Sequence, residues 1–510
     1  MMGIQTTQKD LFSYQVDLDR RVRQDNPLRA IREKVDFAWV RADVAHHYGN
    51  NGNESVDPEV ILKLLFLLFL DNVKSERELM RIVPERLDYL WFLGYGLDDE
   101  IPDHSVPTKA RVRWGRETFE RFFVRTVAQC VELGLVDGRK IYADSSLIDA
   151  NASNKSFVRT SPELAGALRA AYAVEESKFE IPEERRPHSY APQNLTSLSL
   201  TDPDATMATK ELRGTYAIAK PRYKSHRVVD DQCGVVTAVE TTPGHIHDGA
   251  CLLALTEQHH RTTGIGAQTV VGDQHYGTRE NIRGLQAQGI CTHMKVSHNT
   301  SLTTKTGIFH ASEFRYESVS DTYLCPANQP LTRRSYDRVQ RGWIYRAQAT
   351  ACRTCSLRSK CTTSPMKDYQ GRSIVHPEGY ELLVKGWAQA RSAEAKRDLR
   401  HRMSLLEGSF GQASQNHHFK RARWRRLWRQ RIQDHLIAAV QNVKKMVAYG
   451  PTGAGTAAAS LNPSPETGSQ THVGHKTALA ELETIIRLFL SAFVPSLRTE
   501  CRPIALFFNP

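Results

Sequence analysis

The stretch KIYADSSLIDANAS, residues 140–153, decides how the fold is interpreted. A short, mostly apolar run, Lys140 to Ala143, leads directly into Asp144, and a second carboxylate, Asp149, follows five residues later. An apolar run of this length is typical of a buried β-strand. An aspartate at its end is either a turn or capping residue or a carboxylate held rigidly at the edge of a sheet, where ligands bind in open α/β folds.

The same pattern recurs further along the chain. The run Gln268 to Gly272 leads into Asp273, and residues 226–230 and 234–241 are typical of a hairpin. Residues 290–296 form another apolar run, and helical periodicity appears at 249–260 and 279–288. Strands with interposed helices predict an α/β fold, a mixed sheet with helices on both faces.

Bulk composition favours a polyanionic partner and argues against a membrane protein. The chain has 510 residues and a net charge of +12, from 68 Lys+Arg against 56 Asp+Glu. Its richest apolar run, 60–70, is too short to span a bilayer and contains Lys63. No segment resembles a secretion signal, so we expect a soluble, cytoplasmic protein without a membrane partner.

The N-terminal part is helical by period. Helix starts are predicted at Ser55-Val-Asp-Pro-Glu and at Ser75-Glu-Arg-Glu, and 118–133 forms an amphipathic helix. We therefore expect an all-α domain over residues 1–135. Such a domain binds DNA, mediates dimerisation or serves only as a scaffold.

Asp144 and Asp273 together indicate more than either does alone. One aspartate after one strand is more often a turn or cap residue, but two such carboxylates suit hard cations such as Mg²⁺. Two cations flanking a phosphodiester can activate the attacking and leaving oxygens. A third carboxylate is offered by Glu407, beside the apolar face of a helix. The segment His245-Ile-His-Asp248 also carries metal-type side chains, although such residues more often cap loops.

A basic segment follows Glu407 within LLEGSFGQASQNHHFKRARWRRLWRQRIQDHLIAAVQNVKKM, residues 405–446. Arginines that grip phosphates, interleaved with tryptophans at helical spacing, suit a nucleic-acid groove. A solvated basic helix with two tryptophans in the core is the alternative. The predicted DNA-binding residues are Lys420, Arg421, Arg423, Trp424, Arg425, Arg426, Trp428 and Arg429.

Four of the nine cysteines gather between the second and third carboxylates. Cys352 and Cys355 form a C-x-x-C pair, with Cys325 and Cys361 on either side. Thiolates at this spacing bind one tetrahedral Zn²⁺, and the alternative is a set of free buried thiols. We expect a structural zinc knuckle that staples an insertion with little apolar core of its own.

The order of ADSSLIDANAS, TDPDA, GDQHYGTRENI and LLEGSFGQ resembles the DDE transposases of bacterial insertion sequences, of the insertion sequence 1182 type within the insertion sequence 5 group. The N-terminal segments NPLRAIREKVDFAWV and SVDPEVILKLLFLLFLDNVKSERELMRIV resemble the helical, InsH-like N-terminal domain of these enzymes. The resemblance covers residues 26–446. It implies an RNase-H-like core in which Asp-Asp-Glu binds two Mg²⁺ or Mn²⁺ ions and performs DNA cleavage and strand transfer.

Carried over onto this chain, the motifs make Asp144, Asp273 and Glu407 the catalytic and metal-binding residues. Tyr276 falls on the tyrosine of the second motif and becomes an accessory residue. The chain departs from many relatives in having Ser414 where they carry a basic residue, and Met403 where they often carry an arginine. The neighbouring Arg402, Arg400 or Lys420 then supplies the phosphate contact, or activity is weakened.

These observations predict five parts. They are a helical domain at 1–135, a first core part at 136–299 with an insertion at 154–210, a Cys-rich insertion at 300–385, a last core part at 386–446 with a basic Arg/Trp helix, and a linker and tail at 447–510. The expected protein is a nucleoid-associated transposase that binds terminal inverted repeats and target DNA as a dimer or higher assembly. The alternatives are a domesticated or defective DDE protein and a zinc-containing DNA-binding regulator without catalysis.

Overall fold

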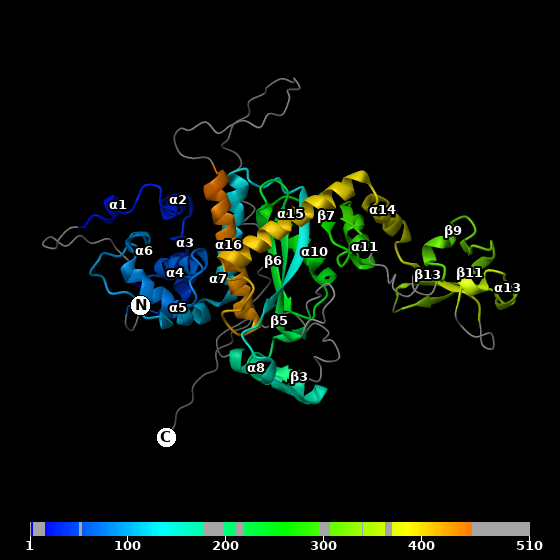
Figure 1. Cartoon of the computed structure of the whole chain (residues 1–510), viewed down its shortest axis with the longest axis horizontal. Coiled ribbons are helices and arrows are strands. Elements are labelled where there is room, and N and C mark those ends of the chain that lie inside the picture. The colour runs from blue at the N-terminus through cyan, green and yellow to red at the C-terminus, as the bar shows by residue number, and fades with distance from the viewer. Residues whose placement is uncertain are drawn as a thin grey trace, which may run out of the picture. The chain divides into compact units, whose positions relative to one another are not determined.

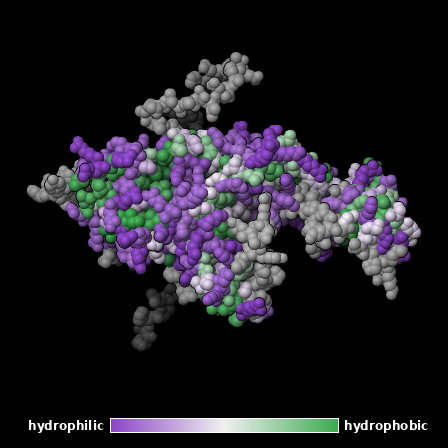
Figure 2. Space-filling view, in the orientation of Figure 1, coloured by the Kyte–Doolittle hydropathy of each residue, from purple (hydrophilic) through white to green (hydrophobic). Residues whose placement is uncertain are grey.

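The computed structural model of the chain describes residues 2–3, 16–49, 54–177, 197–209, 219–295, 307–338, 340–362 and 370–450 (Figure 1). The predicted tail lies outside these residues from 451 onward, as does part of the predicted insertion, 178–196 and 210. None of the described helices combines the length and the apolar character needed to cross a membrane. On the face shown in Figure 2 hydrophilic residues dominate, and hydrophobic ones gather over the N-terminal helices.

The first part of the chain is helical, as its periodicity predicts. Asp57 caps the Glu59 amide and Pro58 begins helix α4, while Ser75 caps helix α5. Helix α4 is apolar on nearly every side and contacts α3, α5, α6 and α7, and residues of these helices belong to one hydrophobic cluster. The helices are α1 (Leu18–Arg21), α2 (Pro27–Lys34), α3 (Trp39–Val44), α4 (Pro58–Leu70), α5 (Glu76–Ile82), α6 (Leu87–Leu93) and α7 (Ser105–Glu132), which breaks at Gly115.

A six-stranded mixed sheet follows. Its order is β4-β5-β1-β7-β8, and β6 also pairs with β5. Strands β1, β7 and β8 are parallel to one another, whereas β5 is antiparallel to β1 and β6 is antiparallel to β5. The strands are β1 (Lys140–Asp149), β4 (Thr206–Ala208), β5 (Lys220–Asp230), β6 (Val236–Pro243), β7 (Thr269–Gly272) and β8 (Cys291–Met294).

Helices cover both faces of this sheet, as expected for an α/β fold. On one face Ile141 and Ala143 pack with residues of α10 (Leu252–Thr263) and α11 (Arg279–Ala287). On the other face Tyr142 packs with residues of α7, α15 (Ala393–Asn416) and α16 (Leu427–Tyr449). This alternation follows from the two-residue period of a strand. Side chains at even positions of β1 therefore face α15 and α16.

The Cys-rich part is a small domain with its own sheet, of order β13-β12-β11-β10-β9. Its strands are β9 (Arg315–Glu317), β10 (Thr322–Leu324), β11 (Pro330–Asp337), β12 (Gly342–Ala347) and β13 (Ser373–Pro377), with α13 (Ala349–Arg353) after β12 and α14 (Tyr380–Ala390) after β13. Phe314, Tyr323, Leu331 and Tyr345 are buried in a cluster of their own. The expectation that this insertion has little apolar core is therefore wrong.

Within the predicted insertion 154–210, β2 (Phe157–Arg159) pairs with β3 (Ser197–Ser199), and α8 (Pro162–Ser177) lies between them in the chain.

One expectation about the main sheet is also wrong. Strand β1 does not end at Ala143 but continues through Asp144 to Asp149. Its second half stays in the sheet because β5 begins at Lys220, earlier than the sequence indicates, and pairs with it along its length.

Candidate active site

Asp144 and Asp273 lie at the same edge of the sheet. Strands β1 and β7 run parallel, and their last paired residues are Tyr142 and Val271. Each aspartate stands two residues beyond that pair, so both lie where β7 ends and β1 continues with β5 as a neighbour. Burial raises the pKa of Asp144, and the negative charge of Asp273 raises it further. The two predicted carboxylates are thus electrostatically coupled neighbours.

The cation beside this pair is a guanidinium. Nη1 of Arg402, from helix α15, lies 2.9 Å from Oδ2 of Asp144, and the two side chains are 13% and 26% exposed. This positive charge lowers the pKa of Asp144 and opposes the effect of burial. Nε of Arg402 is buried and has no hydrogen-bond acceptor among the described residues. Arg402, predicted as an accessory residue, therefore contacts the predicted catalytic strand directly.

Glu407 lies on the same helix but is exposed. Leu405 packs against Gly234, in the turn between β5 and β6 at the amino end of β1. At about 100° per residue, Glu407 lies roughly 200° around the helix from Leu405. Helical geometry thus places Glu407 on the flank facing the carboxyl ends of β1 and β7. Among the described residues, however, it does not join Asp144 and Asp273 in a group whose ligand atoms lie within 4.8 Å of one another.

A carboxylate that the sequence did not single out for this site lies close to Asp144, where it bonds the next residue of the strand. Asp248 accepts a hydrogen bond from Ser145 at 2.7 Å and forms an ion pair with Lys224 at 2.8 Å. Its negative charge also raises the pKa of Asp144. The only signal in the sequence was its place in a His-x-His-Asp segment, whose His247 caps the following turn. Tyr276 is fully buried in this region, and after burial the charges of Asp248, Asp144 and Asp273 raise the pKa of its hydroxyl, so the predicted accessory residue lies near these carboxylates.

The basic segment is largely irregular instead of helical. Helix α15 ends at Asn416 and α16 begins at Leu427. Between them the chain lies against the end of β1, since the Asp149 amide donates to the Lys420 carbonyl and the Ala422 amide donates to the Asp149 carbonyl. This pairing is incompatible with a continuous helix, so the expected basic Arg/Trp helix is only partly present.

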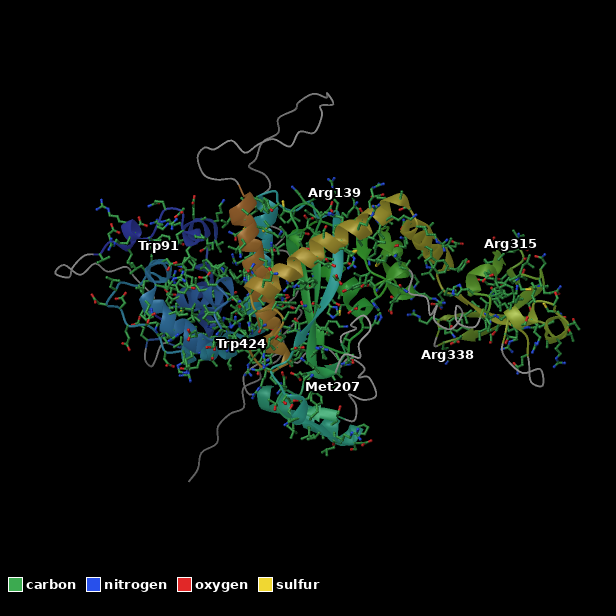
Figure 3. The ribbon with its side chains drawn as sticks, viewed as in Figure 1. Trp91, Arg139, Met207, Arg315, Arg338 and Trp424 are labelled. Carbon is green, nitrogen blue, oxygen red and sulfur yellow. The ribbon has the colours of Figure 1, made fainter. Side chains whose placement is uncertain are left out.

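The predicted DNA-binding residues consequently differ in exposure. Lys420, Arg421 and Arg425 are exposed, Arg423, Trp424, Arg426 and Arg429 are half-buried, and Trp428 is buried at 4% exposure. Trp424 packs edge-on against Phe69 with ring centroids 5.8 Å apart, and it lies beside the N-terminal helices in Figure 3. Arg426 is paired with Asp204 of the TDPDA motif at 3.0 Å. Both tryptophans therefore pack in the protein, which was the alternative to base stacking.

The four cysteines lie close together beside the small sheet. Cys325, Cys352 and Cys361 pack against its core, and the pKa of the Cys361 thiol is raised by burial and by the other three cysteines. The Gln329 amide donates to Sγ of Cys325 at 3.3 Å, across a turn in which Asn328 has a φ of +53°. An amide pointing at sulfur stabilises a thiolate. The donor set therefore suits zinc, although no three of these sulfurs lie within 4.8 Å of one another.

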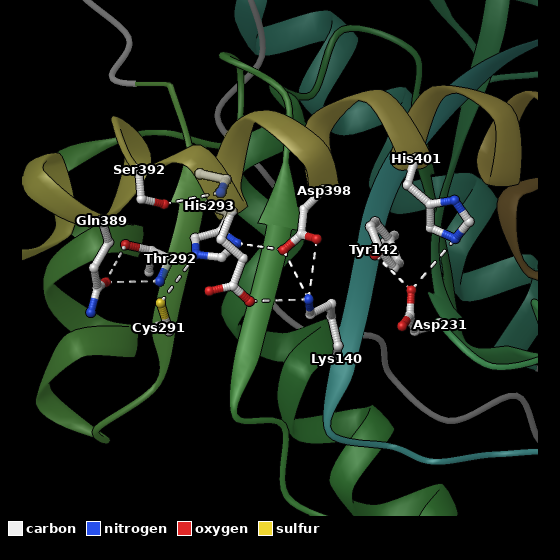
Figure 4. A network of polar contacts seen from close by, with 12 residues as sticks. Lys140, Tyr142, Asp231, Cys291, Thr292, His293, Gln389, Ser392, Asp398 and His401 are labelled. Atoms are coloured by element: carbon white, nitrogen blue, oxygen red, sulfur yellow. Dashed lines mark hydrogen bonds and ion pairs between the residues drawn. The ribbon is translucent and has the colours of Figure 1, made fainter. Parts of the chain in front are cut away.

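One group in the described part of the chain does have the spacing of a metal site. His293, Glu394 and Asp398 present ligand atoms within 4.8 Å of one another. Nζ of Lys140 lies 3.1 Å from Asp398 and 3.3 Å from Glu394, and Figure 4 shows Lys140 pointing toward Asp398. His293 bonds Asp398 at 2.6 Å. Because the Lys140 ammonium already pairs with both carboxylates, this group ties helix α15 to β1 and β8.

Comparisons with known proteins define the class of this chain. Residues 16–113 match the model of the Transposase domain (DUF772), and residues 324–447 match the Transposase DDE domain. These two transposase domains support a DDE transposase of the insertion-sequence type. A search of curated proteins found no match.

One solved structure is similar over 84% of this chain and 82% of the other, at 9% sequence identity and a TM-score of 0.24. It is the cryo-EM structure of the piggyBac transposase synaptic complex with hairpin DNA. A TM-score this low does not establish a shared fold.

Proposed function

We propose that this transposase cuts and joins DNA at the ends of a bacterial insertion sequence, using Asp144, Asp273 and Glu407 in a metal-dependent DDE mechanism. The observation that carries the proposal is the parallel register of β1 and β7, which makes the first two carboxylates neighbours at one sheet edge. We further propose that the sheet is an RNase-H-like core. Antiparallel β1, β5 and β6, followed by parallel β7 and β8 on the other side of β1, support it.

The residues at the sheet edge fit divalent cations in part. Asp144 and Asp273 supply the oxygen ligands that Mg²⁺ or Mn²⁺ prefers, and the partly buried Asp144 is already neutralised by a cationic group, Arg402. When bound, two such ions activate the attacking oxygen and stabilise the leaving oxygen of an in-line displacement. Glu407, from the facing flank of α15, would complete the ligand set.

The chain's own residues would bind and orient the DNA. Arg402 is held beside Asp144 and carries a buried Nε that has no acceptor in the described part of the chain, so it can exchange its carboxylate for a phosphate oxygen. This residue would replace the arginine that relatives often carry at the position of Met403. The exposed Lys420, Arg421 and Arg425 would contact the DNA backbone, where they supply affinity without reading the sequence.

Two further parts of the proposal concern assembly and zinc. Binding two terminal inverted repeats at once requires a dimer or higher assembly, and a DNA-acting enzyme of this kind is expected at the nucleoid. In the small sheet, Cys325, Cys352, Cys355 and Cys361 would hold one structural zinc ion. The alternative of a zinc-containing regulator without catalysis keeps this site but assigns no role to the aspartates.

Alanine substitution separates these possibilities. We expect Asp144→Ala, Asp273→Ala and Glu407→Ala each to abolish Mg²⁺-dependent nicking of DNA carrying the element's ends, while end binding in a gel-shift assay persists. A regulator would show no nicking in the unsubstituted protein, and neither would a defective or domesticated copy. If Glu407→Ala alone still nicks at the normal rate, Asp248→Ala is the next variant, because Asp248 is the other carboxylate close to Asp144.

A further inference from the structure

A cavity of about 300 Å³ lies where the two segments matched to transposase domains meet. One wall comes from Lys74 and Ser75, at the start of helix α5. The opposite wall comes from His418, Arg421 and Arg423, in the irregular segment between α15 and α16. Asn151, just beyond strand β1, also contributes to the lining. The proposed catalytic mechanism uses none of this cavity.

Arg423 has no anionic partner among the residues that the structure describes. Its Nε, Nη1 and Nη2 are all buried, and none of them has a hydrogen-bond acceptor in that part of the chain. The guanidinium lies over the Phe69 ring at 4.9 Å, and burial lowers the pKa of Arg423 to about 10. Buried charges are normally paired, because removing a charge from water is costly. This buried charge lies beside a cavity and is not paired in the described part of the chain, so an anion bound in the cavity would neutralise it.

The rest of the lining has the same sign of charge. Lys74 and Arg421 are exposed at the cavity, and the charges of Arg423 and Arg421 both lower the pKa of His418, after burial. The one carboxylate in the lining, Glu76, already pairs with Arg111. An anion entering the cavity would therefore meet three cationic groups and no free carboxylate among the described lining residues.

The walls of the cavity are held together by direct contacts, so the site is largely preformed. His417 Nδ1 lies 2.7 Å from the Phe69 carbonyl oxygen, and Asn72 donates to the Gln415 carbonyl at 3.4 Å. Trp424 carries the Arg111 guanidinium over its ring at 3.8 Å. A preformed site binds its ligand without an additional ordering cost.

The cavity is also connected to the proposed catalytic strand. Asp149, the last residue of β1, is hydrogen-bonded to Lys420 and Ala422, which precede Arg423. Asp144 lies five residues earlier on the same strand, a separation of about 17 Å at ~3.3 Å per residue. This length corresponds to about five base-pair steps along a B-DNA duplex at ~3.4 Å each.

We propose that this cavity binds one phosphate group, supplied by the DNA backbone about five base pairs from the phosphate being cut. Lys74 and Arg421 contact the phosphate oxygens, and Arg423 supplies the buried positive charge beneath them. The N-terminal helical domain thereby contributes Lys74 to the DNA path. The assignment to DNA rests on the proposed transposase function, whereas the existence of a phosphate site does not.

The first test uses the full chain and inorganic phosphate. Thermal unfolding is followed with phosphate or with chloride at equal ionic strength. We expect phosphate to raise the Tm of the unsubstituted protein, because a ligand that binds only the folded state stabilises it. Lys74→Gln and Arg423→Gln should lose this phosphate-specific rise. Arg81→Gln is the matched control, since it removes a surface charge from helix α5, which begins two residues after Lys74, and because Arg81 lies outside the cavity this variant should keep the rise.

Equal phosphate-specific shifts in all four proteins would overturn the site. Because Lys74 is exposed, its variant tests the proposal even if Arg423→Gln folds poorly. No phosphate-specific shift in the unsubstituted protein would also overturn it.

The second test identifies the source of the phosphate. Binding to duplex DNA is measured as a function of salt concentration, and each lost phosphate contact reduces the magnitude of the negative slope of log K against log salt by about 0.9. We expect that loss for Lys74→Gln and Arg423→Gln, equally on unrelated sequences, and no change for Arg81→Gln. Unchanged slopes together with a phosphate-dependent Tm would assign the cavity to free phosphate and overturn its role in DNA binding. Failure of the chain to nick DNA would leave both tests interpretable.

Discussion

Replacing Arg402 by glutamine should strengthen metal binding in the absence of DNA. Arg402 neutralises Asp144 at 2.9 Å, and a divalent cation must displace it to reach that carboxylate. At an effective dielectric constant of about 20, two unit charges at that distance attract by about 6 kcal/mol. Partial exposure of both side chains, and the freedom that each regains on separation, reduce the net coupling to about 1–2 kcal/mol.

Glutamine keeps much of the side-chain length but removes the charge. A gain of about 1–2 kcal/mol corresponds to Mn²⁺ binding that is about 5- to 30-fold tighter. The assay is calorimetric titration of the DNA-free protein with Mn²⁺ at pH 8, where the Asp144 carboxylate is ionised despite its raised pKa. Arg400→Gln is the control, because Arg400 is an exposed residue of the same helix that bonds only the Lys396 carbonyl in the described part of the chain.

Unchanged Mn²⁺ affinity in Arg402→Gln would contradict this reasoning. If Arg402→Gln binds Mn²⁺ no more tightly than the unsubstituted protein, while Arg400→Gln is also unchanged, then Arg402 does not occupy the position of a metal. The account of Asp144 as a metal ligand would then lose its main electrostatic support. A similar gain in both variants would point to a general effect of net charge.

Three other changes test the fold and the zinc proposal. Arg227 and Asp434 form a fully buried ion pair at 2.7 Å, so Asp434→Ala should lower the free energy of unfolding by about 3–5 kcal/mol in urea, against about 0.5 kcal/mol or less for the exposed Asp25→Ala. Burial raises the pKa of Asp202 to about 6, so between about pH 4 and 6 the folded state binds more protons than the unfolded state. The free energy of unfolding should therefore fall as the pH rises through this range. Asp202→Asn should abolish this loss, which is about 3 kcal/mol at 1.36 kcal/mol per pKa unit; equal pH profiles would contradict it. Elemental analysis should find one zinc per chain, lost in Cys352→Ser together with a lower Tm, and a metal-free unsubstituted protein would refute the zinc site.

The sequence predicted the strands that lead into Asp144 and Asp273, because a short apolar run is a strong signal for a buried strand. Asp144 and Asp273 follow such runs, and parallel strands bring the ends of those runs to one edge. The continuation of β1 could not be predicted in this way. Ser145 and Ser146 resemble a turn, and they stay in a strand only because β5, far along the chain, pairs with them. Pairing with a strand that is distant in the sequence therefore determines the structure here, and the local polarity of the residues does not.

In the basic segment, helical spacing in the sequence predicted a helix that is only partly present. Trp424 and Trp428 have helical spacing, yet only Trp428 lies in a helix. The backbone around Lys420 and Ala422 instead bonds Asp149, and no periodicity in the sequence reports such a contact. Arg402 was identified as an accessory residue from its position near Glu407, but its pairing with Asp144 depends on how α15 crosses the sheet.

Asp144 is the proposed metal ligand at a DNA-cutting site, whereas Asp149 is proposed to be structural. Asp149 is bonded to Arg222 at 2.8 Å and its backbone holds the basic segment. The most direct measurement compares Mg²⁺-dependent nicking of DNA carrying the element's ends by Asp144→Asn and by Asp149→Asn. We expect Asp144→Asn to bind the ends normally but lose nicking, and Asp149→Asn to keep it. Normal nicking by Asp144→Asn would contradict the account.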